Sequence, residues 1–148
     1  LNPHHHDSWY NLGATVTPGS TVTVNNKPYS ESKCYLEALK SNWEDSDAWI
    51  SLGISLRTER IPVNGKEYTR NMCIVEGLKH NPKNTAGWNN LGSGLTAAEK
   101  VIVNDKEYTN QMCLVESLKH DPENDNAWFN LGIDALPISP KRSSCEKL

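Results

Sequence analysis

The chain has 148 residues and a net charge of −3 at pH 7, with 15 lysine and arginine residues against 18 aspartate and glutamate residues. The basic residues do not cluster, so the charge gives no reason to expect nucleic acid or an anionic membrane surface as a partner. No apolar run approaches the ~20 residues of a membrane helix, and the N-terminus lacks the residue order of a signal peptide. We therefore expect a soluble chain without a membrane span.

One motif, Trp-x-x-Leu-Gly, recurs four times along the chain. Its tryptophans, Trp9, Trp49, Trp88 and Trp128, are separated by 40, 39 and 40 residues. A period of this length is typical of repeat proteins, in which each unit buries its apolar face against the next unit. The sequence therefore predicts an array of similar units without one central core.

Three histidines precede the first motif. A proline stands six residues before three of the four tryptophans, so residues 4–6 are in register with residues 83–85 and 123–125. This register predicts an ordinary turn between repeats. Consecutive side chains on a turn rarely close a metal site, so we expect no metal and no other cofactor at His4, His5 and His6.

The repeated motif itself predicts a helix with one buried face. At about 100° per residue, Leu52, Gly53 and Leu56 all lie within about 60° of Trp49. Glycine inside a helix costs about 1 kcal/mol relative to alanine, so its recurrence predicts that a neighbouring helix crosses closely at each one. These glycines are Gly13, Gly53, Gly92 and Gly132.

A β-hairpin is predicted after each of the first three motifs, at residues 21–29, 61–68 and 101–108. The central pairs Asn25-Asn26, Asn64-Gly65 and Asn104-Asp105 tolerate the positive φ of a type I′ turn. Two-residue turns at these positions predict the cross-strand pairs Val22–Tyr29, Ile61–Tyr68 and Val101–Tyr108. Pro28 and Pro62 blunt the strand edges that would join the first two hairpins, so we expect separate hairpins there, each with its tyrosine face on its own repeat. Pairing of the second hairpin with the third remains open.

A second helix is expected to begin near Ser30, Thr69 and Thr109, which are suited to cap a first turn. Its apolar stripe contains Cys34, Cys73 and Cys113, so these thiols are expected to be buried and reduced. The pairs Met72–Val75 and Met112–Val115 widen the stripe and are expected to receive the hairpin. With no Asn-x-Ser/Thr site in the chain, we expect a reducing, cytoplasmic location.

The predicted domain is an array over residues 1–136, with repeats at 7–43, 46–82 and 86–122 and a partial repeat at 126–136. Residues 137–148 are either a tail or the start of a further helix. The ends of such an array leave apolar surface uncovered. We therefore expect weak end-to-end self-association.

The spacing of Trp49, Leu52, Gly53 and Leu56, followed by Gly77 and Pro82, resembles the tetratricopeptide repeat. The resemblance implies a mainly α fold, an α-solenoid of antiparallel helix pairs. The chain departs from the family by its period of 39–40 residues, against a usual ~34, and by the hairpin between the two helices of each repeat.

The resemblance also implies that the first helices line a concave groove that holds a peptide or protein segment. Asparagines recur on this face and resemble the asparagine ladder in the repeat domain of O-GlcNAc transferase. Such a ladder can bind a peptide backbone because an amide can both donate to and accept from an extended main chain. They can also be read as ordinary solvent-facing residues. The expected binding residues are Tyr10, Asn11, Ile50, Ser51, Asn89, Asn90, Phe129 and Asn130.

The function expected from these features is a non-enzymatic scaffold for protein–protein interaction. The alternative is a substrate-recruiting or assembly arm of a larger enzyme whose catalytic domain lies outside this chain. No nucleophile–base–acid set or phosphate loop is recognisable in the sequence. His80 and His120 end equivalent helices and are interpreted as charge partners of those helix ends.

Overall fold

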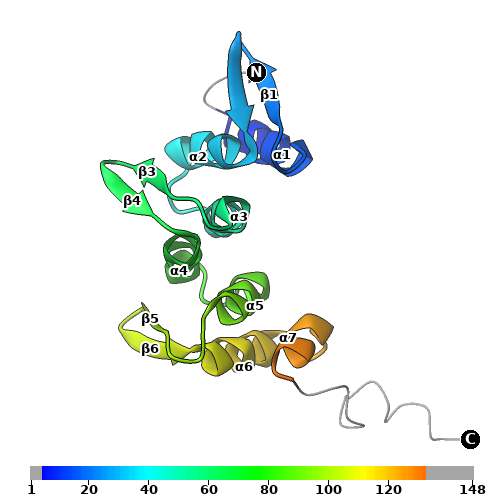
Figure 1. Ribbon diagram of the computed structural model, residues 1–148, viewed down its shortest axis with the longest axis vertical. Coiled ribbons are helices and arrows are strands. Elements are labelled where there is room, and N and C mark those ends of the chain that lie inside the picture. The colour runs from blue at the N-terminus through cyan, green and yellow to red at the C-terminus, as the bar shows by residue number, and fades with distance from the viewer. Residues whose placement is uncertain (1–4, 133–148) are drawn as a thin grey trace, which may run out of the picture. The chain divides into compact units, whose positions relative to one another are not determined.

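The computed structural model describes residues 5–132, which fall into two compact units, one ending at Asn81 and the other beginning at Pro82. Both units are built from one repeated order of elements, a helix, a two-stranded hairpin and a second helix (Figure 1). The predicted end of the fourth repeat, residues 133–136, and the predicted tail, residues 137–148, lie outside the described residues.

The first unit contains this order twice. Its elements are α1 (His6–Thr15), β1 (Thr21–Val24), β2 (Lys27–Ser30), α2 (Glu31–Ser41), α3 (Ser46–Leu56), β3 (Ile61–Val63), β4 (Lys66–Tyr68) and α4 (Arg70–His80). The second unit contains it once and adds one short helix. Its elements are α5 (Thr85–Gly94), β5 (Lys100–Val103), β6 (Lys106–Thr109), α6 (Asn110–His120) and α7 (Asp125–Asn130).

The fold is mixed α/β, so the prediction of a mainly α, solenoid fold was wrong. The described residues form seven helices and three two-stranded antiparallel sheets. The sequence pattern predicted hairpins inserted into a helical array. In the structure they belong to the core, because Val63 and Tyr68 are buried in one cluster with Trp49 and Leu52. Strands and helices together therefore build each repeat.

Turn chemistry fixes the register of every hairpin. The two central residues of each turn have positive φ, for example 49° and 61° at Asn25 and Asn26, as a type I′ turn requires. The predicted pairs Val22–Tyr29, Ile61–Tyr68 and Val101–Tyr108 are confirmed. Within the first unit, the hairpins β1–β2 and β3–β4 form separate sheets, as the prolines predicted.

Each hairpin lies with its tyrosine on the tryptophan of its own repeat, which confirms the predicted docking. The ring centroids of Trp9 and Tyr29 are 4.8 Å apart, those of Trp49 and Tyr68 5.3 Å, and those of Trp88 and Tyr108 4.6 Å. The expectation that the methionine–valine pairs would receive the hairpin is confirmed at Met72, which packs against the cluster that includes Val63 and Tyr68. It was wrong at Met112 and Val115, whose side chains are exposed. The tyrosine is covered by the indole of the first helix instead.

Glycines allow the two helices of a repeat to approach closely. A Cβ added at Gly53 would lie 2.7 Å from the carbonyl oxygen of Arg70, and one added at Gly92 would lie 2.7 Å from Leu114 Cγ. The predicted close crossing at Gly132 is not present. The helix α7 ends at Asn130, and Gly132 follows it with a φ of 70° and no heavy atom within 4 Å of an added Cβ.

Hydrogen bonds explain two of the sequence patterns. The hydroxyls of Ser30, Thr69 and Thr109 accept the backbone N–H three residues later and cap the second helices, as predicted. The indole Nε1 of Trp88 donates to the carbonyl of Pro82 at 2.7 Å, and that of Trp49 donates to the carbonyl of Trp43 at 2.8 Å. Any residue six positions before the tryptophan can supply this carbonyl, which is why Trp43 can stand in place of proline.

Candidate binding face

In the first unit the expected binding residues lie on α1 and α3. The hydroxyls of Tyr10 and Ser51 are 3.4 Å apart, and the ring of Tyr10 lies 5.5 Å from that of Tyr35. Tyr10 and Ser51 are half-buried, and Asn11 is exposed on α1. The structure therefore brings Tyr10 and Ser51 together across two successive first helices, with Asn11 beside them in the chain.

Ile50, the remaining expected binding residue of α3, is not accessible to a ligand. Its side chain is 4% exposed, and a Cβ added at Gly77 would lie 2.8 Å from Ile50 Cγ1. The missing side chain of Gly77 lets α4 close over Ile50. This residue therefore stabilises the α3–α4 pair and cannot reach a ligand in this arrangement.

In the second unit the expected residues lie on α5 and α7. The Asn130 side-chain amide donates to the Asn89 Oδ1 atom at 3.1 Å, and the Asn90 amide donates to the carbonyl of Ala86 at 2.9 Å. Phe129 is 76% exposed. Asn89 and Asn130 are thus joined, Asn90 is held partly against its own helix, and Phe129 presents an apolar surface to solvent.

The same side-chain bridge occurs once in each unit. Tyr10 and Asn89 each follow the tryptophan of one repeat by one position, and their partners Ser51 and Asn130 follow the next tryptophan by two. We call these two contacts the first-helix bridges. Polar groups at these repeated positions lie side by side, so their spacing along the chain corresponds to a repeated geometry.

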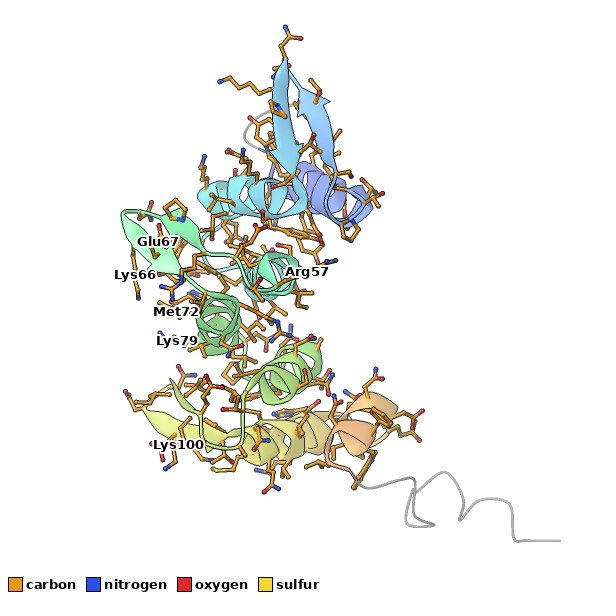
Figure 2. The ribbon with its side chains drawn as sticks, viewed as in Figure 1. Arg57, Lys66, Glu67, Met72, Lys79 and Lys100 are labelled. Atoms are coloured by element: carbon orange, nitrogen blue, oxygen red, sulfur yellow. The ribbon has the colours of Figure 1, made fainter. Side chains whose placement is uncertain are left out.

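The first helices differ in charge from the second helices. Over residues 5–132, α1, α3, α5 and α7 carry no lysine or arginine, and their acidic residues are Asp7, Asp47 and Asp125. The second helices carry mixed charges, for example the pair Lys79–Glu76 at 3.1 Å on α4. Figure 2 shows Lys79 on α4 and Lys66 with Glu67 on the β3–β4 hairpin. In each unit, the helices that carry the first-helix bridge are therefore neutral to acidic.

His6 is a polar residue whose role the sequence reading missed. It was expected in a turn, but it is the first residue of α1. Its Nδ1 atom lies 3.1 Å from the carbonyl oxygen of Ala38, and its Nε2 atom pairs with the Asp45 carboxylate. The available signal was its register with Ser46, Thr85 and Asp125, each of which is the first residue of a first helix.

Cys34, Cys73 and Cys113 are buried and form no disulfide with one another, as predicted. Burial, aided by nearby glutamates, raises the pKa of Cys34 to about 11 and the pKa values of Cys73 and Cys113 to about 12. The thiolate is the reactive form, so these side chains are poor nucleophiles at neutral pH.

Thiol labelling checks this assignment. At pH 8 we expect Cys34, Cys73 and Cys113 to react with a maleimide much more slowly in the folded protein than in urea, with each site followed by peptide mass spectrometry. Because their pKa values are raised on folding, the stabilisation they contribute is present below the ordinary thiol pKa near 8.5 and is lost as pH rises above it. Labelling at the same rate with and without urea would show that the second helices do not bury them.

The described part of the chain contains no group of three or more His, Cys, Asp or Glu side chains placed to hold a metal ion. The seven helices in residues 5–132 have between 6 and 11 residues, which is too few to span a bilayer. No protein-family model and no curated protein matches the chain. The candidate site therefore has to be judged from its own geometry.

Proposed function

We propose that, in each unit, the surface formed by its own first helices, α1 and α3 in one and α5 and α7 in the other, binds an extended segment of a partner protein. The observation that carries this proposal is the recurrence of the first-helix bridges, Tyr10–Ser51 and Asn89–Asn130, at the same positions in two units. In each unit the bridge sets polar groups of two first helices side by side, which suits a ligand that carries both donors and acceptors, and the main chain of a peptide is such a ligand. The Trp-x-x-Leu-Gly motif also supports the proposal, because it resembles the tetratricopeptide repeat, and that resemblance implies that the first helices hold a peptide or protein segment.

The chemistry of the bridges supports replacement by a ligand. A hydrogen bond between neutral side chains contributes only about 0.5–1.5 kcal/mol, so a peptide can substitute for it at little cost. An amide offers a donor and an acceptor at once, which matches the N–H and C=O groups of an extended chain. Phe129 and the ring of Tyr10 add apolar surface beside these polar groups. The proposed ligand is therefore held mainly through its backbone.

A pair of asparagine substitutions tests the proposal. A phage-displayed library of linear peptides is selected on the folded protein, and the affinity of a selected peptide is measured by calorimetry. The double variant Asn90→Ala and Asn130→Ala should weaken binding by about 1–3 kcal/mol, because it removes amides that pair with the peptide backbone. Thermal stability should change little, since Asn130 is exposed and Asn90 is half-buried at the helix surface.

Gln111→Ala is the matched control, because Gln111 is an exposed amide on the second helix α6. It should leave peptide affinity unchanged. Equal affinity of the asparagine double variant and the wild type would contradict the proposal and place the peptide elsewhere, with the strand edges of the hairpins as the next candidate.

A further inference from the structure

The helices α1 and α3 of the first unit lie side by side and run in the same direction. Where they begin, the His6 ring contacts the carboxylate of Asp45, which caps α3. Further along both helices, the hydroxyls of Tyr10 and Ser51 are 3.4 Å apart. The two contacts follow in the same order on both helices, so residues at equivalent positions before and after the bridge are also neighbours.

Both helices carry the same order of side-chain chemistry on their outward stripe. Each stripe begins with an aspartate, continues with an amide or a hydroxyl and ends with an apolar side chain. Its three members lie within about 60° of one another at about 100° per residue. All are exposed except the serine, which is half-buried. The members are Asp7, Asn11 and Ala14 on α1, and Asp47, Ser51 and Ile54 on α3.

The surface of the first unit therefore has three rows across its two helices. We call them the acidic row (Asp7 and Asp47), the polar row (Asn11 and Ser51, with Tyr10 between them) and the apolar row (Ala14 and Ile54). At a rise of about 1.5 Å per residue, the acidic row lies about 6 Å before the polar row and the apolar row about 4.5 Å after it.

An extended peptide that crosses both helices on the polar row would meet the other two rows with its side chains. Its N–H and C=O groups point toward the amide and hydroxyls of the polar row. Side chains of an extended chain stand perpendicular to these groups and alternate between two sides. Here the two sides lie along the helix axes. Successive ligand side chains therefore face the acidic row and the apolar row in turn.

The two ends of the stripe select opposite properties. The helices α1 and α3 themselves carry no lysine or arginine, so a cationic side chain is favoured at the acidic row. Arg57 follows α3 directly, three positions after Ile54, and disfavours a cation at the apolar row (Figure 2). Ile54 is 40% exposed, so an apolar ligand side chain would remove part of its surface from water.

The second unit lacks this order on α5. Its equivalent residues are Ala86, Asn90 and Ser93, so the amide is kept while the aspartate and the large apolar side chain are not. Contacts with a peptide backbone can therefore be common to both units, whereas a preference for particular ligand side chains belongs to the first unit.

We propose that the first unit binds an extended peptide in which basic and apolar residues alternate. The basic side chains reach the acidic row, and the apolar side chains lie against Ile54 and Ala14. This inference rests on the proposed function, because the polar row holds the backbone, and it adds the chemical class of the ligand.

Three short dye-labelled peptides test this preference on the full chain by fluorescence anisotropy. Lysine alternates with valine in the first, glutamine replaces every lysine in the second, and serine replaces every valine in the third. We expect the lysine–valine peptide to bind about 3- to 10-fold more tightly than the glutamine–valine peptide at low salt, since exposed ion pairs are individually weak. This preference should shrink at high salt, which screens exposed charges.

The acidic row is tested with Asp7→Asn and Asp47→Asn combined, which should bring this affinity ratio close to one. An aspartate in the first turn also stabilises its helix, but a loss of structure would weaken both peptides alike and leave the ratio unchanged. Asp125→Asn is the matched control, because it removes an exposed first-turn aspartate of α7 in the second unit. It should keep the wild-type ratio.

The apolar row is tested with Ile54→Ser. The wild type should prefer the lysine–valine peptide to the lysine–serine peptide about 2- to 5-fold, because part of a valine is removed from water. Ile54→Ser should abolish this preference, and Ile102→Ser, at an exposed isoleucine of the second unit, should preserve it.

Equal affinity of the lysine–valine and glutamine–valine peptides, or an affinity ratio that the double aspartate variant leaves unchanged, would overturn the inference. The proposed function would still stand in that case if a library-selected peptide binds and is weakened by Asn90→Ala with Asn130→Ala. If no peptide of any composition binds, both the inference and the proposed function are wrong.

Discussion

Replacing Tyr108 with alanine is expected to lower the free energy of unfolding by about 3–5 kcal/mol. The Tyr108 side chain is 7% exposed, its ring lies 4.6 Å from that of Trp88, and Lys106 Nζ lies 4.9 Å above it. Alanine would leave a cavity between the hairpin β5–β6 and α5. The loss is measured as a shift of the urea unfolding midpoint, followed by tryptophan fluorescence.

Ile102 provides the matched control on the same hairpin. It lies on β5 opposite Glu107, on the outer face, and is 63% exposed. Ile102→Ala removes a similar apolar side chain but should change the free energy of unfolding by less than about 0.5 kcal/mol. If both variants were equally mild, the hairpin would be a dispensable insertion, and a mainly α core would describe the repeat better.

The second large effect is expected at the glycines that join α3 and α4. A Cβ at Gly77 would lie 2.7 Å from the Ser46 carbonyl oxygen, and a Cβ at Gly53 would lie 2.7 Å from the Arg70 carbonyl oxygen. Backbone atoms cannot rotate away as side chains do, so the helices must separate. Gly53→Ala and Gly77→Ala should each cost about 1–3 kcal/mol by overpacking, although alanine favours a helix.

The loss of unfolding free energy is measured from the shift of the urea midpoint. Lys33→Ala is the control, an alanine substitution at a helix position without close contacts to another helix. Lys33 is exposed on α2, so this change should stay within about 0.5 kcal/mol of the wild type. A stabilising effect of Gly53→Ala or Gly77→Ala would mean that helix propensity outweighs contact, and that α3 and α4 do not approach as closely as described.

Local chemistry made much of each repeat predictable. The type I′ turn residues determine hairpin register because a two-residue loop permits one pairing, and the cap residues determine where the second helices begin. The fold class was mispredicted because the same sequence pattern can describe a hairpin on the surface or a hairpin in the core. The decisive contact, a tyrosine ring on a tryptophan ring, joins residues about 20 positions apart and is not visible in either helix or strand periodicity.

Only part of the candidate site could be predicted from the sequence, because the contacts that cover a helix face come from distant residues. A helical wheel gives the direction of a side chain but not how deeply a neighbouring helix covers it. Tyr10 and Ile50 occupy equivalent positions, but the closure of α4 at Gly77 buries Ile50 while Tyr10 keeps part of its surface. The link between His6 and Asp45 depends on two side chains meeting across repeats, which repeat register alone does not reveal.

The central proposal, that the first-helix face holds a peptide backbone, is tested most directly by NMR of the isotope-labelled protein with a selected peptide. We expect the largest changes in the side-chain amide signals of Asn11, Asn90 and Asn130, with little change in the backbone signals of the hairpins. Changes concentrated on the strand β5 (Lys100–Val103), with the asparagine signals unmoved, would contradict the proposal and assign binding to the hairpin edge.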